Sequence, residues 1–261
     1  MESISATVDS DTQVIVIDDE SSDDRVVPFI ESVIRAGGPR WRFVRQPRNL
    51  GFVATANLGM RLAQTDVILL NSDTEVTPGW LAGMAACLAS DDRIGTATPW
   101  SNNGEIVSIP EFCKANPAPQ SAAAIARCIA GFSQHRDLER YPELPTAVGF
   151  CMAISRKAIE EVGLFDSAHF GLGYGEENDF SLRASQSGFR NVLCDDVYVV
   201  HHGGRSFGPL GLAPDEGSME RLLQRHPRYR EQIEAFITAD PLSARRQEIC
   251  AAVVEAGIGF D

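Results

Sequence analysis

The stretch "DVILLNSDTEVTPGWL", residues 66–81, decides the fold that we expect for this chain. Its apolar run, Val67–Leu70, stops at the polar residues "NSD", and Pro78 then opens a helical pattern. A short apolar run bounded by turn residues is typical of a strand that is buried on both faces. An ordinary turn also needs polar residues. Asp73 therefore has two interpretations, a turn residue or a carboxylate presented to a ligand at a strand end.

The same alternation of apolar runs and helical patterns extends in both directions from this stretch. Further strand-like runs lie at residues 12–19, 41–46, 93–100, 146–155 and 191–200. Regular alternation of strands and helices predicts an α/β protein with a mostly parallel, doubly wound sheet and helices on both faces. We expect this main domain to cover residues 1–213, with a Pro/Asn-rich insertion at 101–145 that holds one helix. Residues 214–261 read as polar helices, a C-terminal helical extension.

Composition excludes several classes of function. The chain has 261 residues, of which 44% are hydrophobic, and 36 acidic residues against 23 basic ones give a net charge of -13. That balance argues against a nucleic-acid partner. Six cysteines without a CxxC pair predict free thiols in a reducing compartment. Without a signal-like start or a membrane-length apolar run, a cytoplasmic location is expected. The basic cluster at residues 225–230 leaves peripheral contact with the inner face of the membrane open.

Polar residues follow three of the predicted strands: Asp18–Asp19, Asp73 and His201–His202. In an open α/β sheet, ligands bind beyond the carboxyl ends of the strands, so these residues are expected on one rim. The chain has neither a GxGxxG after its first strand nor a P-loop. A divalent ion between Asp73 and one histidine would still neutralise the diphosphate of a nucleotide sugar. Polar capping of a strand end explains the two histidines equally well.

A third cluster of polar residues lies in "GYGEENDF", residues 173–180. Glu176, Glu177 and Asp179 crowd the first turn of a predicted helix, where the helix dipole stabilises carboxylates. Three acids in four residues are more than a helix start requires. Repulsion between like charges raises the pKa of at least one carboxylate, which is how a general base is made.

Several of these segments, in this order, resemble the family-2 glycosyltransferases with the GT-A fold. The segments are "VIVIDDESSDD", "NLGFVATANLGM", "ILLNSDTEVTPGWL", "GFCMAISRKAIEEVGLFD", "GYGEENDFSLRASQSGF" and "VVHHGGRSF". The similarity runs from about Val14 to Phe207 and looks closest to the bacterial rhamnosyltransferase-like branch that builds surface polysaccharides. It implies inverting transfer of a hexosyl or deoxyhexosyl group from a nucleotide-diphospho-sugar to a glycan or lipid-linked acceptor. It also implies Mn²⁺ or Mg²⁺ as the cofactor.

The resemblance assigns the donor side, about residues 1–100, position by position. Asp18 matches the acid that contacts the nucleotide base. The residues that match the loop and helix around the base and ribose are Asn49, Gly51 and Asn57. "NSD" stands where the family carries its DxD-like signature. All three of its residues are predicted to bind the nucleotide sugar, with Asn71 toward the ribose or a phosphate, Ser72 beside it, and Asp73 as the metal ligand.

The catalytic and acceptor side, residues 101–213, is assigned in the same way. Glu177 stands at the position of the catalytic base, where Asp is usual, and the sequence does not separate it from Glu176. His201 fits the spacing to Gly203 and Ser206–Phe207 better than His202 does, and would be the second metal ligand. The residues expected at the acceptor are Trp100, Asn102 and Tyr174, although a surface loop packed by its own aromatic residues explains them nearly as well.

One feature of the family is missing from the expected fold. The family opens with a central strand and a helix before the strand that matches "VIVIDD", and "MESIS" looks like the tail of that helix. Loss of a central strand leaves two ladders of backbone groups unpaired. The alternative function is therefore a glycosyltransferase-like module without turnover, either truncated or partner-binding. A nucleotidyltransferase is disfavoured, because no basic triphosphate loop is present.

Overall fold

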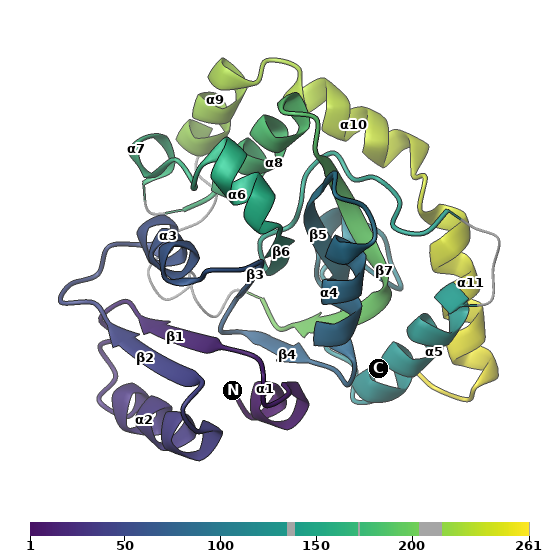
Figure 1. The fold of residues 1–261 in the computed structure, drawn as a ribbon. Coiled ribbons are helices and arrows are strands. Elements are labelled where there is room, and N and C mark those ends of the chain that lie inside the picture. The colour runs from purple at the N-terminus through teal and green to yellow at the C-terminus, as the bar shows by residue number, and fades with distance from the viewer. Residues whose placement is uncertain (135–138, 172, 204–215, 261) are drawn as a thin grey trace.

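The computed structural model describes all residues except 135–138, 172, 204–215 and 261 (Figure 1). Its strands are β1 Val14–Asp18, β2 Trp41–Arg45, β3 Val67–Leu70, β4 Thr74–Val76, β5 Ile94–Trp100, β6 Cys151–Ile154 and β7 Arg190–His201. Its helices are α1 Glu2–Thr7, α2 Val26–Gly37, α3 Phe52–Leu62, α4 Trp80–Ala89, α5 Ala122–Gln134, α6 Arg156–Val162, α7 Ser167–Phe170, α8 Glu176–Gln186, α9 Glu216–Arg225, α10 Tyr229–Ala239 and α11 Ser243–Glu255, with a 3₁₀ turn η1 at Glu105–Val107.

The main sheet has five strands in the order β3-β6-β5-β7-β4. Only β5 and β7 run parallel in it, whereas the pairs β3–β6, β5–β6 and β4–β7 are antiparallel. The expected α/β architecture is confirmed, but the expectation of mostly parallel pairing is wrong. The reason is connectivity. β6 follows the long segment after β5 rather than a regular crossover helix, and β4 is a three-residue edge strand, so neither is constrained to the parallel direction.

Helices cover both faces of this sheet, as expected. The side chains of β6 show it by their alternation. Cys151 and Ala153 join a hydrophobic cluster with residues of α4, α5 and α11. Met152 and Ile154 join a second cluster with residues of α3, α6 and α8. Because neighbouring residues of a strand point to opposite faces, these two clusters are the two sides of one sheet.

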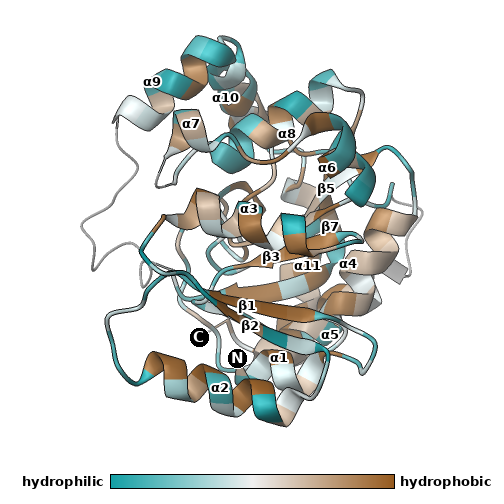
Figure 2. Cartoon of the chain, turned by 60° about the vertical axis from the view of Figure 1, so that its left-hand side comes forward, coloured by the Kyte–Doolittle hydropathy of each residue, from teal (hydrophilic) through white to brown (hydrophobic). Residues whose placement is uncertain are grey.

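The strands β1 and β2 form a separate parallel sheet that packs on α2 (Figure 2). Within the described part of the chain, β1 pairs only with β2 and β3 pairs only with β6. The apolar residues Val14–Ile17 and Val67–Leu70 are only half-buried, in contrast to the fully buried β5 and β6. Each of these two strands therefore has an unpaired edge within the described residues.

The C-terminal part is helical, as expected, and contributes to both hydrophobic clusters. Ile249 and Val253 of α11 pack in the cluster with α5, and Leu222 and Tyr229 pack in the cluster with α8. The expected boundary between residues 213 and 214 lies outside the described residues. In the part of the chain that the structure covers, no helix has the length and apolar character needed to span a bilayer.

Candidate active site

The edge strand β4 brings Asp73 beside His201. "NSDTEV" does not end in a free turn, because Thr74–Val76 pair antiparallel with the last residues of β7, and Thr74 lies opposite His201. The backbone N–H of His202 donates to the carbonyl oxygen of Asp73 over 2.9 Å. The Asp73 side chain is buried, and its Oδ1 lies 3.6 Å from Nε2 of His201. Two predicted metal ligands, 128 positions apart by their numbers, thus meet at one end of the sheet.

The orientation of His201 is fixed by its neighbours. Its Nδ1 lies 2.6 Å from the carbonyl oxygen of Asn103, so Nδ1 is the donor and Nε2 faces Asp73. Its ring stacks on Phe150 at 5.3 Å between centroids. Burial lowers the pKa of His201, but Asp73, the Asn103 carbonyl and Glu105 outweigh it and raise that pKa overall. His202 faces Glu75 instead, at 3.8 Å.

This donor set fits a divalent ion. A carboxylate oxygen and an imidazole nitrogen 3.6 Å apart can both contact one ion whose ligand distances are about 2.0–2.2 Å. Within the described ranges, no group of three histidine, cysteine or acidic residues could hold a metal. Asp73 and His201 would therefore hold Mn²⁺ or Mg²⁺ together with oxygen atoms of a ligand, such as a diphosphate.

The start of α8 supplies a pair of glutamates, of which Glu176 is buried and Glu177 is partly buried. Glu177 lies over Gly149, where an added Cβ would be 3.7 Å from its Cγ. Its Oε1 accepts a hydrogen bond from Nδ2 of Asn178 over 3.2 Å. Oε2 of Glu177 and Oε2 of Glu176 are both buried and make no hydrogen bond to the described residues. Two neighbouring carboxyl groups, each with one oxygen buried, are costly to ionise together, so one is expected to hold a proton.

The pKa values of this pair follow from burial. Desolvation raises the pKa of Glu177 to about 7. Desolvation and then the charge of Glu177 raise the pKa of Glu176 further, to about 9. Glu177 therefore ionises first on rising pH, and Glu176 keeps its proton longer. Burial, and then the charges of Glu176 and Glu177, raise the pKa of Tyr174 in the preceding loop.

Glu105 is a third acid at this site, which the sequence pattern did not single out. It belongs to η1, and its φ of 51° is an unusual backbone conformation for a residue other than glycine. Although Glu105 is exposed at the surface, desolvation by its neighbours raises its pKa, and its charge acts on both Glu177 and His201. Glu105 therefore lies within electrostatic reach of both the glutamate pair and the metal-ligand pair.

Several residues predicted to bind the nucleotide-sugar donor gather around the loop after β1. Oδ2 of Asp18 lies 3.2 Å from Nε of Arg45, and Oδ1 accepts from the backbone N–H of Ser21 over 3.0 Å. The carboxylate of Asp19 accepts from the N–H groups of Leu50 and Gly51, both over 2.8 Å. Asp19 thus fixes the "NLG" loop against the end of β1. A role for it was not predicted, although the doubled acid "DD" was a signal.

Comparisons with known proteins identify the family of this chain. A family model described as glycosyl transferase family 2 matches residues 1–163. This chain belongs to glycosyl transferase family 2. It is 28% identical to an uncharacterized protein of Mycobacterium bovis over 163 residues, which are 60% of this chain and 56% of that protein. It is 25% identical to a probable N-acetylgalactosaminyltransferase 9 of Caenorhabditis elegans over 213 residues, 76% of this chain and 36% of that protein. The chain thus spans about half the length of the first of these relatives.

Solved structures of this fold superpose on most of the family-2 chain. The crystal structure of GalNAc-T7 with UDP, GalNAc and Mn²⁺ superposes on this chain with a TM-score of 0.62 and 17% sequence identity. The match covers 92% of this chain and 54% of that one. Staphylococcus aureus TarS 1–349 in complex with UDP gives 0.54 at 14% identity, over 95% of this chain and 63% of that one. These likenesses show the fold, which is the GT-A fold expected from the motifs.

Three predicted ligand contacts of the family-2 chain are not supported by the side-chain positions. Trp100 is 0% exposed and lies in the core of β5, so it cannot contact an acceptor. Asn102 is buried and bonds both the backbone N–H and the carbonyl of His201, at 2.9 and 3.0 Å, so it positions that histidine. Both polar atoms of the Asn57 side chain bond the backbone of Phe165, which makes Asn57 a packing residue between α3 and the segment before α7.

The other predicted residues lie near the candidate site. Asn71 donates its backbone N–H to the carbonyl of Phe150 over 3.0 Å, next to the ring that stacks on His201. Ser72 is exposed between Asn71 and Asp73. Phe150 was present in a motif of the resemblance, but its stacking on His201 was not predicted. The residues Ser206–Phe207 lie outside the described residues.

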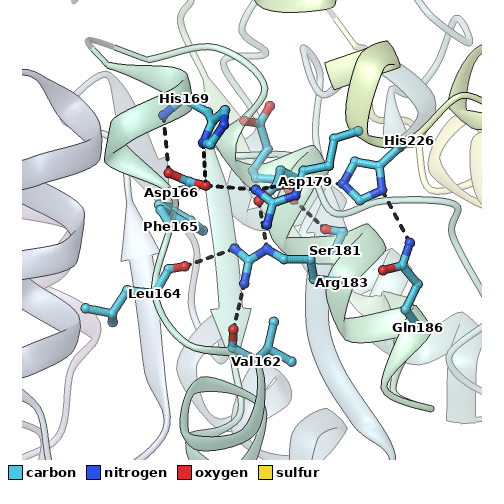
Figure 3. Close-up of polar contacts among 12 residues, drawn as sticks. Val162, Leu164, Phe165, Asp166, His169, Asp179, Ser181, Arg183, Gln186 and His226 are labelled. Atoms are coloured by element: carbon cyan, nitrogen blue, oxygen red, sulfur yellow. Dashed lines mark hydrogen bonds and ion pairs between the residues drawn. The ribbon is translucent and has the colours of Figure 1, made fainter. Parts of the chain in front are cut away.

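Asp179, the third acid of "GEEND", is part of a buried ion-pair cluster and not of the glutamate pair (Figure 3). We call Asp179, Arg183, Arg225 and His226 the Asp179 cluster. Oδ2 of Asp179 lies 2.8 Å from Nε of Arg183. Oδ1 of Asp179 lies 2.9 Å from Nε2 of His226 and 3.2 Å from Nη1 of Arg225. This cluster ties α8 to the end of α9.

Proposed function

We propose that this chain transfers a sugar from a nucleoside-diphospho-sugar to an acceptor hydroxyl with inversion at the anomeric carbon. The observation that carries the proposal is the meeting of Asp73 and His201 across β4 and β7, with Glu177 over Gly149, next to the Phe150 ring that stacks on His201. An ion on Asp73 and His201 would supply positive charge for the departing diphosphate. GalNAc-T7, which shares the fold, was crystallised with UDP and Mn²⁺.

Glu177 is the proposed general base. Its pKa of about 7 lies near physiological pH, which suits a group that must accept a proton and later release it. Glu177 removes the proton of the acceptor hydroxyl while that oxygen attacks the anomeric carbon. The bond from that carbon to the diphosphate oxygen breaks, and the nucleoside diphosphate leaves with the electron pair. Glu176 holds its proton to higher pH, so it is the weaker candidate.

The donor half of the proposed site is formed by residues 1–100. Asp18, Asn49 and Gly51 lie around one loop and would bind the base and ribose, and Asn71 with Ser72 would lie toward the ribose or a phosphate. The acceptor half is residues 101–213, with Tyr174 next to the glutamate pair. A rhamnosyl-type donor, a glycan or lipid-linked acceptor in surface-polysaccharide synthesis, and a location at the cytoplasmic face of the membrane are finer parts of the same proposal.

The second candidate function is a glycosyltransferase-like module without turnover. It is favoured by one observation, the unpaired edges of β1 and β3, because β1 carries the proposed base-binding Asp18. Calorimetry with UDP, GDP and dTDP, each with and without Mn²⁺, tests metal-assisted donor binding. Mn²⁺-dependent binding of at least one of them is expected. Absence of such binding for all three would overturn the enzyme proposal. Binding without sugar transfer from any matching donor would support the second candidate.

A further inference from the structure

Two consecutive hydrogen bonds join the C-terminal helices to the side chain of Glu177. Tyr229 is the first residue of α10, and its hydroxyl donates to Oδ1 of Asn178 over 3.0 Å. Asn178 donates from Nδ2 to Oε1 of Glu177 over 3.2 Å. A side-chain amide has its acceptor and its donors at opposite ends. The bond from Tyr229 therefore determines that the donor end of Asn178 faces Glu177.

Tyr229 itself is held firmly in place. It is 7% exposed and packs in the same hydrophobic cluster as Phe170 and Phe180. Its backbone N–H donates to the carbonyl of His226 over 3.0 Å, and the ring of His226 is bound to the buried Asp179. Burial, together with the charges of Glu105 and Glu177, raises the pKa of Tyr229 to about 12. Its hydroxyl therefore keeps the proton that it donates to Asn178.

We propose that Asn178 of α8 and Tyr229 of α10 are positioning residues for glycosyl transfer. Together they orient the carboxylate of Glu177 and so connect it to the C-terminal helices. This inference rests on the proposed function, because it assigns the two hydrogen bonds to the catalytic base. Tyr229 fixes the amide of Asn178, and Asn178 holds one oxygen of Glu177 and leaves Oε2 for the acceptor proton. All three residues lie beyond residues 1–163, which the family model matches. The C-terminal helices are then part of the catalytic apparatus and not only a support.

The hydrogen bond from Asn178 also opposes the charges around Glu177. The titratable groups that face Glu177 are Glu176 from α8, Glu105 from η1, Tyr174 from the loop before α8 and Tyr229 from α10. Glu176 and the two tyrosines keep their protons at neutral pH, so desolvation and the charge of Glu105 are what disfavour the ionised carboxylate. A donor on Oε1 favours it, because a hydrogen bond to a carboxylate stabilises the charged form. Loss of the correctly oriented Asn178 amide must therefore make Glu177 harder to ionise.

The test is the substitution Tyr229→Phe, which removes the hydroxyl and keeps the ring. We expect kcat to fall about tenfold, the value for one hydrogen bond to a charged group, with the KM for the donor unchanged. The acid limb of the pH profile is expected to move to higher pH. Tyr141→Phe is the matched control, since Tyr141 is equally buried and its hydroxyl bonds only Arg140 among the contacts described. The control is expected to keep the wild-type kcat and pH profile.

A double-mutant cycle separates this chain of hydrogen bonds from two independent effects. Asn178→Ala is expected to show the same shift of the pH profile, and Tyr229→Phe added to it is expected to change little more. Additive losses, or a Tyr229→Phe variant with the wild-type kcat and profile, would overturn the inference. A loss of kcat without a shift of the profile would also overturn it, since general damage to the fold accounts for that result.

A spectroscopic measurement keeps this inference separate from the proposed function. In protein labelled with ¹³C-glutamate, the carboxyl signal of Glu177 is identified by its loss in Glu177→Gln. Its titration midpoint is expected at higher pH in Tyr229→Phe than in wild-type protein or in Tyr141→Phe. An unchanged midpoint overturns the inference even if the protein transfers sugar. A shifted midpoint in a protein that transfers no sugar leaves the hydrogen bonds in place and overturns only their assignment to catalysis.

Discussion

Thr74 lies opposite His201 in the antiparallel pair of β4 and β7, and this register places the Asp73 carboxylate 3.6 Å from the His201 ring. The next residue along the chain, His202, points instead to Glu75. Successive side chains of a strand alternate between its two faces, so one residue of register decides which histidine faces Asp73. The choice between the two histidines, which the sequence alone left to spacing, thus follows from a backbone pairing.

Removal of either proposed metal ligand is expected to abolish Mn²⁺-dependent binding of a nucleoside diphosphate. Asp73→Asn and His201→Ala should each weaken that binding by more than about tenfold, since loss of even a supporting group costs that much at metal sites. His202→Ala is the control, because its ring faces Glu75, and it should bind as wild type does. Calorimetry with and without Mn²⁺ measures the difference. Equal losses in all three variants would contradict the assignment.

Replacement of the base is expected to separate binding from transfer. Glu177→Gln keeps the size of the side chain and should leave donor affinity unchanged, while kcat falls by about 10²- to 10⁴-fold. Glu176→Gln is the matched neighbour and should lose less than about tenfold, because Glu176 stays protonated when Glu177 is ionised. Single-turnover rates with a bound donor provide the measurement. A larger loss in Glu176→Gln would exchange the two roles.

The raised pKa values of the glutamate pair predict how stability depends on pH. The usual glutamate pKa is 4.5, and in the folded protein Glu176 and Glu177 titrate near 9 and 7. Between these values the folded state binds more protons than the unfolded state, so the free energy of unfolding falls as pH rises. The stabilisation is complete below about pH 4.5 and is lost through the folded pKa values. Glu176→Gln should therefore be more stable than wild type at pH 9, and the advantage should disappear at pH 5, as measured by urea unfolding.

The Asp179 cluster is expected to be a major source of stability. Asp179 is 0% exposed, and its removal would leave the largely buried Arg183 without its carboxylate partner, while Arg225 would keep its pair with Asp166 at 2.8 Å. Asp179→Ala should lower the free energy of unfolding by about 3–5 kcal/mol, the usual cost of breaking a buried ion pair. The exposed pair of Asp23 and Arg25 is the control, and Asp23→Ala should change the free energy of unfolding far less, because solvent screens an exposed ion pair. Similar values for the two variants would show that the buried cluster is not special.

The strand–helix alternation and the strand ends could be predicted from the sequence, because both depend on local patterns. Asp73 and His201 could be paired in advance, since each follows an apolar run. β4 could not be predicted, because three residues are too few for a periodic signal. Hydrogen-bond partners far apart in the sequence could not be predicted either. The bonds between the Asn57 side chain and the backbone of Phe165 are an example, because they join residues 108 positions apart. Trp100 was assigned to the acceptor for a related reason: it ends the strand expected over residues 93–100, and a local pattern does not tell whether an aromatic residue at a strand end packs in the core or lines a site.

The division into two sheets has a consequence for how the protein opens. Residues 14–45 form a β1–α2–β2 unit that shares no ladder hydrogen bond with the five-stranded sheet in the described part of the chain. A unit joined by few backbone bonds can unfold locally at a lower free energy than the whole protein. The proposed base-binding Asp18 belongs to this unit, whereas His201 belongs to β7 of the other sheet and Asp73 directly precedes its strand β4. A nucleotide-sugar donor that contacts both the β1–α2–β2 unit and the five-stranded sheet would hold the two together. By mass action, its binding would slow hydrogen exchange in β1 and β2 more than in β6.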